Sequence, residues 1–323
     1  MVRIVLNITV RILAIAFLCS FPRSGEPSEL ECRPLPWLNG AQIGSDRNGN
    51  VWAADPRARS VELFDVAGRS LLRQEMPAFR SVDVDREWGV AALDSHGVAL
   101  TASRLDGSTS SFPLGTEMAD IAWISRDEVA VSPTRAAHLV EIWDLETGRA
   151  TGRFGEVDEI RPEPGVTFLR STQLRYSAEE SRLYALDSLT GALQAFSLRG
   201  EPLLAAEVPA HRLPELEEWR VGLEAEARQR GEIQTPLYTV LRLAEGPQGG
   251  VWIVEQCTPD RKGVRIVEIL PDQRSRALSW SLSEAACSLN FSVLDGSLLF
   301  IRRQSSEKRT SGALVCQPLS RAM

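Results

Sequence analysis

The chain has 323 residues, of which 43% are hydrophobic and 24% charged, and it carries a formal net charge of −7. This hydrophobic content is enough for a sizeable core and excludes an intrinsically disordered protein. Without residues 1–25 the charge would be −10, because that segment contains three arginines and no acidic residue. Such an acidic body disfavours nucleic acid and anionic membrane surfaces as partners.

Residues 1–25 have the pattern of an export signal. A segment with two arginines, MVRIVLNITVR, is followed by the apolar run ILAIAFLCSF and then by FPRSGEP. Arg11 interrupts the apolar stretch, which is then short for a helix that spans a bilayer. We therefore predict a signal peptide over 1–25 and a body over 26–323 that is periplasmic or extracellular. The alternative is an uncleaved N-terminal anchor, which would be the expected route of any membrane attachment.

The body repeats a pattern of short strands and turns. Residues 43–72 contain four short period-2 runs separated by turns, which is the pattern of one antiparallel sheet. Runs that align with VWAAD recur at intervals of 39, 39, 54, 68 and 47 residues, starting at Val51, Val90, Val129, Leu183, Val251 and Leu298. One such sheet cannot bury its own faces, whereas radial packing buries each sheet on two neighbours. We therefore predict an all-β, six-bladed β-propeller, with a solenoid of stacked repeats as the alternative.

The two ends of the chain indicate how the ring closes. The sixth unit has no fourth strand after 313–319, while 30–36 is a spare extended run before the first unit. Pairing these segments would close the ring with an N-terminal strand.

Four cysteines follow the predicted leader, and they allow three disulfide pairings. Ring closure would place Cys32 on the strand beside Cys316, so we predict a disulfide between these two. Cys257 and Cys287 fall on the same rim of the predicted propeller and are the remaining compatible pair. The alternative is that all four are free thiols in a reducing compartment.

Two connections are longer than the repeat requires. The segment 154–166 is rich in proline and acidic residues, and 210–236 contains an apolar stripe at helical spacing: Leu216, Trp219, Leu223 and Ala227. Both connect the outer strand of one blade to the inner strand of the next, so they emerge on one face. We predict a helical insert over 211–236, between blades four and five, that packs on this face. Trp219 is then a candidate ligand contact, and a purely structural brace is the alternative.

Charged residues recur at one position of the aligned second strands. The fifth position holds a carboxylate in four of the six units, in the order Asp55, Asp94, Pro133, Asp187, Glu255 and Arg302. This position lies on the rim that carries both insertions. Converging carboxylates there could hold a cation such as Ca²⁺ or a basic ligand. The competing interpretation is that each aspartate accepts hydrogen bonds from its own turn.

The other chemistry-bearing residues form no recognisable catalytic pattern. The three histidines are isolated, and the sequence contains no P-loop, no G-x-S-x-G and no H-E-x-x-H motif. We therefore assign no catalytic residue, no metal ligand and no cofactor. Trp88 and Trp219 are candidate sugar platforms if they are exposed on the insertion-bearing face.

One unit resembles a known repeat. The pattern Asp46-x-x-Gly49-Asn50-Val51-Trp52, followed by Ala54-Asp55 and then by Phe64-Asp65 with Gly68, resembles the NHL-type repeat. The body resembles the exported bacterial six-bladed β-propellers of the TolB-like superfold over about residues 30–319. This resemblance implies the fold, and most members of the group have no established activity. It also allows a metal-dependent hydrolase or lyase of the lactonase type, whose Glu, Asn and Asp set is not assigned here.

We therefore expect an exported, monomeric, non-catalytic propeller. Its partner would be a protein or a small-molecule ligand bound on the face that carries the 154–166 and 210–236 insertions. The alternative is the metal-dependent hydrolase or lyase, which would hold a single divalent cation.

Overall fold

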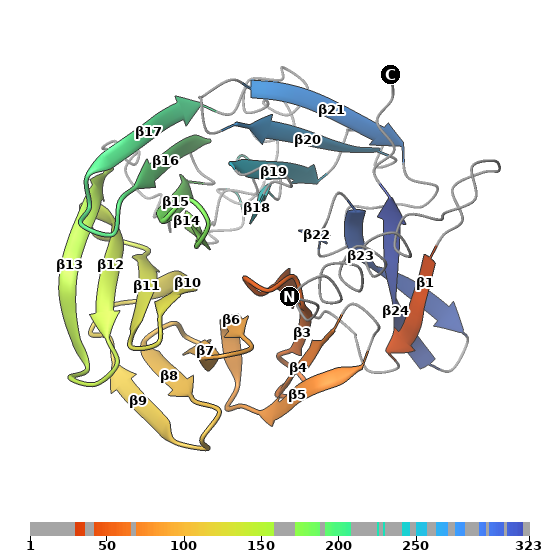
Figure 1. The fold of residues 1–323 in the computed structure, drawn as a ribbon, viewed down its shortest axis with the longest axis horizontal. Helices are drawn as coiled ribbons and strands as arrows, with labels where there is room; N and C mark the ends of the chain where they lie inside the picture. Colours follow the sequence, from red (N-terminus) through yellow and green to blue (C-terminus); the bar gives the residue numbers. More distant parts are fainter. Residues whose placement is uncertain are drawn as a thin grey trace, which may run out of the picture.

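The computed structural model of the chain is an all-β propeller (Figure 1). It describes residues 30–35, 42–65, 69–157, 172–187, 191–207, 241–245, 250–256, 263–270, 275–281, 291–294, 297–306 and 309–318, together with the isolated Ala225 and Gln229. In these segments 24 strands form six four-stranded antiparallel sheets. The sheets are arranged around a common axis, so the predicted propeller fold is confirmed.

Five of the sheets are each built from four consecutive strands, and we call them blades 1 to 5. Blade 1 contains β2 (Gln42–Ser45), β3 (Val51–Asp55), β4 (Ser60–Phe64) and β5 (Ser70–Glu75). Blade 2 contains β6 (Phe79–Asp85), β7 (Gly89–Asp94), β8 (Ala99–Ser103) and β9 (Thr109–Pro113). Blade 3 contains β10 (Met118–Ser125), β11 (Glu128–Pro133), β12 (His138–Asp144) and β13 (Arg149–Glu156).

The next two blades continue this order. Blade 4 contains β14 (Thr172–Ser177), β15 (Arg182–Asp187), β16 (Ala192–Phe196) and β17 (Pro202–Glu207). Blade 5 contains β18 (Leu241–Glu245), β19 (Val251–Gln256), β20 (Gly263–Ile269) and β21 (Ser275–Ser281).

The remaining sheet, which we call the closing sheet, joins the two ends of the described chain. Its order is β1-β24-β23-β22, formed by β22 (Phe291–Leu294), β23 (Ser297–Ser306), β24 (Arg309–Pro318) and β1 (Leu30–Leu35). The predicted pairing of an N-terminal strand with the last strand of the chain is therefore confirmed. The inner strands of neighbouring sheets touch, and β22 contacts both β18 and β2.

The register of β1 bears on the predicted disulfide. Leu30 lies opposite Cys316, and the register shifts between Glu31 and Pro34. Cys32 thus lies within an irregular part of the strand beside β24, and it is not the residue directly opposite Cys316. The Cys32–Cys316 disulfide stays a prediction, and Cys257 and Cys287 lie outside the described residues.

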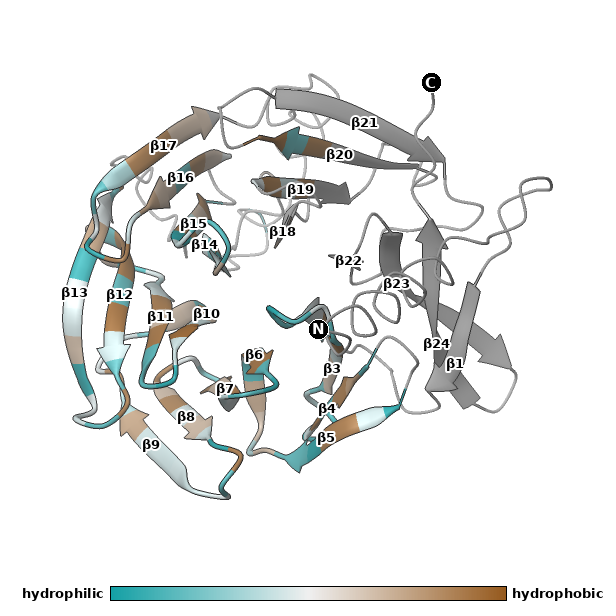
Figure 2. Ribbon diagram, viewed as in Figure 1, coloured by the Kyte–Doolittle hydropathy of each residue, from teal (hydrophilic) through white to brown (hydrophobic). Residues whose placement is uncertain are grey.

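All six predicted second strands lie within observed strands. Where their burial is described, these second strands are buried on both faces between neighbouring blades, as β3 is throughout its length, and this shared environment explains the recurring apolar pattern. Between blades 1 and 2, for example, Trp52 and Val61 pack with Phe79, Val84 and Val90 in one apolar cluster. The outer strands β9 and β13 instead alternate between exposed and half-buried residues, and Figure 2 shows them paler than the strands inside them.

Strand order defines two rims. The insertion rim is the one where second strands such as β3 end and where each outer strand leads to the next blade. The inner-turn rim is the opposite one, and it carries the turns between the first and second strands of each blade. Most of the predicted insert over 211–236 and most of the loop over 154–166 lie outside the described residues, as does the predicted leader. Among the residues described, no helix has the length and apolar character required to cross a membrane.

Trp52 packs against the backbone of Gly44, which lies opposite it on the neighbouring strand. A Cβ atom added to Gly44 would come within 2.2 Å of the Trp52 ring. We predict that Gly44→Ala lowers the free energy of unfolding by about 1–3 kcal/mol, the usual cost of overpacking a core. Urea unfolding followed by circular dichroism measures this change.

Gly152 is the matched control for this prediction. It lies on β13, and its added Cβ would meet no atom closer than the Ile142 side chain at 3.6 Å. Gly152→Ala should leave stability unchanged or raise it by less than about 1 kcal/mol. Equal losses in the two variants would contradict the packing that we describe.

Candidate functional site

Two of the predicted rim carboxylates, those of Asp55 and Asp94, accept hydrogen bonds from their own turns. Asp55 Oδ1 accepts the backbone N–H groups of Arg57 and Ala58 at 2.8 and 3.1 Å. Asp94 Oδ1 accepts those of Val98 and Ala99 at 2.7 and 3.0 Å. These two aspartates thus cap their own turns, as the competing interpretation of the sequence expected.

The other predicted site residues are described less completely. Asp187 is buried at the end of β15, and its backbone carbonyl accepts the N–H of Gly191. Glu255 and Arg302 lie on β19 and β23, but their side chains are outside the described part of the structure, as is all of Trp219. Among the described side chains, no three His, Cys, Asp or Glu residues gather closely enough to hold a metal ion. Asp55, Asp94 and Asp187 are therefore not gathered closely enough to hold a metal ion, and their part in binding a basic ligand stays a prediction.

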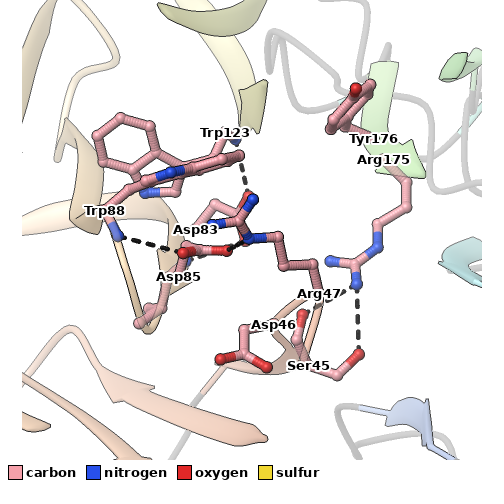
Figure 3. Close-up of a pocket in the computed structure, with 10 residues that line it drawn as sticks. Ser45, Asp46, Arg47, Asp83, Asp85, Trp88, Trp123, Arg175 and Tyr176 are labelled. Carbon is pink, nitrogen blue, oxygen red and sulfur yellow. Dashed lines mark hydrogen bonds and ion pairs between the residues drawn. The ribbon is translucent and has the colours of Figure 1, made fainter. Parts of the chain in front are cut away.

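A pocket lies on the inner-turn rim, opposite the predicted face (Figure 3). Its volume is about 20 Å³, which is room for one water-sized group. Blades 1 to 4 all contribute to its lining, through Ser45, Asp46, Arg47, Asp83, Val84, Asp85, Trp88, Trp123, Arg175 and Tyr176. The sequence patterns did not predict this pocket.

Two aspartates shape the turns that carry the pocket. Asp46 Oδ1 accepts the backbone N–H groups of Asn48 and Asn50 at 2.9 and 2.8 Å, and its Oδ2 accepts the Asn50 side chain. Asp85 holds the equivalent turn of blade 2 by accepting the N–H groups of Glu87 and Trp88 at 2.8 and 3.1 Å. These caps fix the backbone on either side of Arg47 and Trp88.

Arg47 links the first two blades above the pocket. Its Nε lies 3.0 Å from Asp85 Oδ2, and it also pairs with Glu87. Its guanidinium carbon lies 3.8 Å from the centre of the Trp88 ring, a favourable cation–π arrangement. The side chain is 29% exposed, so the guanidinium is held in place and is still reachable from solvent.

Trp88 and Trp123 form the aromatic side of the pocket. Their ring centres are 6.1 Å apart and the planes are inclined by 59°, so the blade 2 turn packs on blade 3. Trp88 is half-buried and lies on the inner-turn rim. It therefore does not lie on the insertion-bearing face, where it was expected as a candidate sugar platform. The Nε1–H of the buried Trp123 has no hydrogen-bond partner among the described residues.

Arg175 crosses from blade 4 to blade 1. It extends from β14 and donates to the carbonyl oxygen of Ser45 at 2.9 Å and to the Ser45 hydroxyl at 3.3 Å. Figure 3 shows it reaching Ser45 from the side opposite the two indoles. The guanidinium therefore ties together two strands that are 130 residues apart in sequence.

Asp83 is a pocket carboxyl group that contacts the backbone of the neighbouring blade. Its Oδ2 accepts the backbone N–H of Trp123 at 2.8 Å, and its Oδ1 accepts that of Val84 at 3.0 Å. Burial raises the pKa of Asp83 to about 6, although the Arg175 charge and the two N–H groups act in the opposite direction. Burial also raises the pKa of Asp85, against the effect of the N–H of Glu87 and the charge of Arg47. The pocket thus contains a carboxyl group that changes its charge close to neutral pH.

No protein-family model and no curated protein matches the sequence. Solved structures with the same fold do match. A Bacteroides fragilis protein whose name describes it as exported is 11% identical with a TM-score of 0.57, covering 91% of this chain and 95% of that one. A DUF4221 family member from Bacteroides vulgatus is 11% identical with a TM-score of 0.55, covering 90% and 96%. A streptogramin B lyase is 13% identical with a TM-score of 0.53, covering 91% and 100%. At these identities the likeness shows the propeller fold alone.

The raised pKa of Asp83 predicts a pH-dependent contribution to stability. The unfolded carboxyl titrates near 3.8 and the folded one near 6, so the folded state binds more protons between these values. The stability due to this group therefore falls as the pH rises from about 4 to 6. Asp83→Asn removes the titration, so its stability relative to wild type should rise over this interval, by on the order of 2 kcal/mol. Urea unfolding between pH 4 and 7 measures the difference.

Asp144 provides a control of opposite sign. Hydrogen bonds from Thr147 lower the pKa of this exposed carboxyl, so Asp144→Asn should differ from wild type in its pH dependence mainly below pH 4. A flat difference between Asp83→Asn and wild type from pH 4 to 7 would contradict the assignment for Asp83.

Proposed function

We propose that the chain is an exported, non-catalytic β-propeller that binds its ligand at the inner-turn pocket. The observation that carries this proposal is the meeting of side chains from four blades at one small opening. Two guanidinium groups, two indoles and three carboxylates are held there by contacts that fix their geometry. Binding sites often combine such an aromatic surface with a few oriented polar groups.

Export is the part of this proposal that rests on the leader. The apolar run within 1–25 favours a periplasmic or extracellular body, as does the fold likeness to a bacterial protein named as exported. We further propose that the closing sheet serves as a sixth blade of an NHL-like ring, because its inner strand β22 contacts both β18 and β2.

The insertion rim is a second proposed contact surface, suited to a protein partner. Both long connections, from β13 to β14 and from β17 to β18, leave the blades on this rim. A partner bound there would not compete directly with a ligand in the inner-turn pocket, because the two lie on opposite rims.

The alternative proposal is a metal-dependent hydrolase or lyase of the lactonase type, to which the fold likeness to a streptogramin B lyase is relevant. Elemental analysis of the purified protein separates it from the binding proposal. A stoichiometric divalent ion that resists dialysis would support the enzyme and contradict our proposal. We expect less than about 0.1 ion per chain, because a site built by three or four protein ligands would retain its ion.

A ligand panel tests the pocket directly. Small organic acids, amines, sugars and divalent metal salts are each screened for an increase in the melting temperature of the full chain. A ligand that binds only the folded state stabilises it by mass action, so at least one class should raise the melting temperature. Arg47→Gln should abolish most of that increase, because it removes the one of the two pocket guanidinium groups that the solvent-facing side of the pocket presents to a ligand.

Arg104→Gln is the matched control for this panel. Arg104 is 25% exposed, close to the 29% of Arg47, and it forms an ion pair with Asp127 at 3.0 Å, so the control also removes a partly exposed, paired guanidinium, but one outside the pocket. The control should retain the full ligand effect. Absence of any stabilising class, or equal loss of the effect in both variants, would contradict binding at the pocket.

A further inference from the structure

Hydrogen-bond donors and acceptors in the pocket are used unequally. Every oxygen of its three carboxylates, Asp46, Asp83 and Asp85, already accepts a hydrogen bond or pairs with Arg47. On the donor side, Trp123 Nε1–H is buried without a partner among the described residues. Arg47 uses Nε and one terminal nitrogen, and its other terminal nitrogen has no partner in the described structure. Among these described side chains, the pocket therefore has unused hydrogen-bond donors, while each carboxylate oxygen already has a partner.

The volume limits what these donors can bind. A pocket of about 20 Å³ accepts one terminal group, so the rest of a ligand would lie over the opening beside Trp88. A buried indole N–H without a partner costs free energy that an acceptor would recover. A carboxylate is an acceptor-only group that suits a guanidinium, which binds it through two parallel N–H groups.

The charges of the pocket balance most closely when Asp83 is neutral. Its lining carries three carboxylates and two guanidinium groups. The charged groups that act on Asp83 are Arg175 on β14 and Asp120 on β10. Protonation of Asp83 leaves Asp46 and Asp85 balanced by Arg47 and Arg175. An anionic ligand should therefore bind more tightly below about pH 6 than at pH 7.5.

We infer that the inner-turn pocket binds the carboxylate of a small ligand, with Arg47 and the indole N–H of Trp123 as its donors. This inference rests on the proposed function and names the ligand class of the same site. The Arg175 bridge closes the pocket on the side of blade 4, and the carboxylate enters from the side of Arg47.

Indole ¹⁵N–¹H spectra of the full chain test the inference with sodium acetate as the probe. The protein has eight tryptophans, and Trp123→Phe identifies the Trp123 signal. If that variant does not fold, the contact between the Trp88 and Trp123 rings assigns the signal through space. Acetate should move the Trp123 indole proton downfield in a saturable manner, because its N–H gains an acceptor. The apparent affinity should be higher at pH 5.5 than at pH 7.5.

Variants and other probes define the outcomes. Arg47→Gln should weaken acetate binding roughly tenfold or more, which is the effect of losing a charge-assisted hydrogen bond, and Arg104→Gln should not. Saturable shifts with sodium chloride equal to those with acetate would mean an adventitious ion only and would overturn the inference. Shifts with methylammonium and none with acetate would overturn the inference that the ligand is a carboxylate, and they would leave the proposed binding function intact. No shift with any probe, together with a negative ligand panel, would overturn both.

Discussion

The ring depends on hydrogen bonds that the inner strands of blades 2 to 5 each form with a side chain of the preceding blade. An inner strand is the edge of its sheet, so half of its backbone groups have no partner within the blade. Asp83 accepts the N–H of Trp123, Asp120 accepts that of Leu174 at 2.9 Å, and Gln173 accepts that of Leu243 at 3.0 Å. Gln42 donates in the same way to the carbonyl of Arg80. Each contact satisfies a backbone group near the axis and also fixes the spacing of two neighbouring blades.

The pocket is a consequence of the same contacts. Asp83 is held where it meets the backbone of blade 3, and Arg175 is held where it reaches Ser45 of blade 1. These residues stabilise the ring, and they also set the charge and the width of the pocket. The raised pKa of Asp83 is the energetic cost of placing a carboxylate at this buried junction. A structural role and a binding role are therefore compatible in the same side chains.

The sequence predicted the propeller because burial on both faces gives the second strands a similar apolar pattern wherever their burial is described, from VWAAD in β3 to LYALD in β15. It did not predict the pocket, because the aligned inner-strand position before the turn holds Gly44, Asp83, Ala122, Arg175 and Ala244, which share no residue type. Only the ring brings such unlike residues together. The carboxylates that do recur, such as Asp55 and Asp94, recur because similar turns need similar caps. Alignment of the inner strands would have shown charged residues beside the axis, which was the available signal.

Hydrogen exchange of single backbone amides tests the central claim about the inner strands most directly. In Asp120→Ala the amide of Leu174 loses its acceptor, while the amide of Trp123 keeps Asp83. We predict that exchange of the Leu174 amide becomes roughly tenfold faster or more and that the Trp123 amide keeps its protection. An unchanged rate for Leu174, or an equal acceleration of both amides, would contradict it.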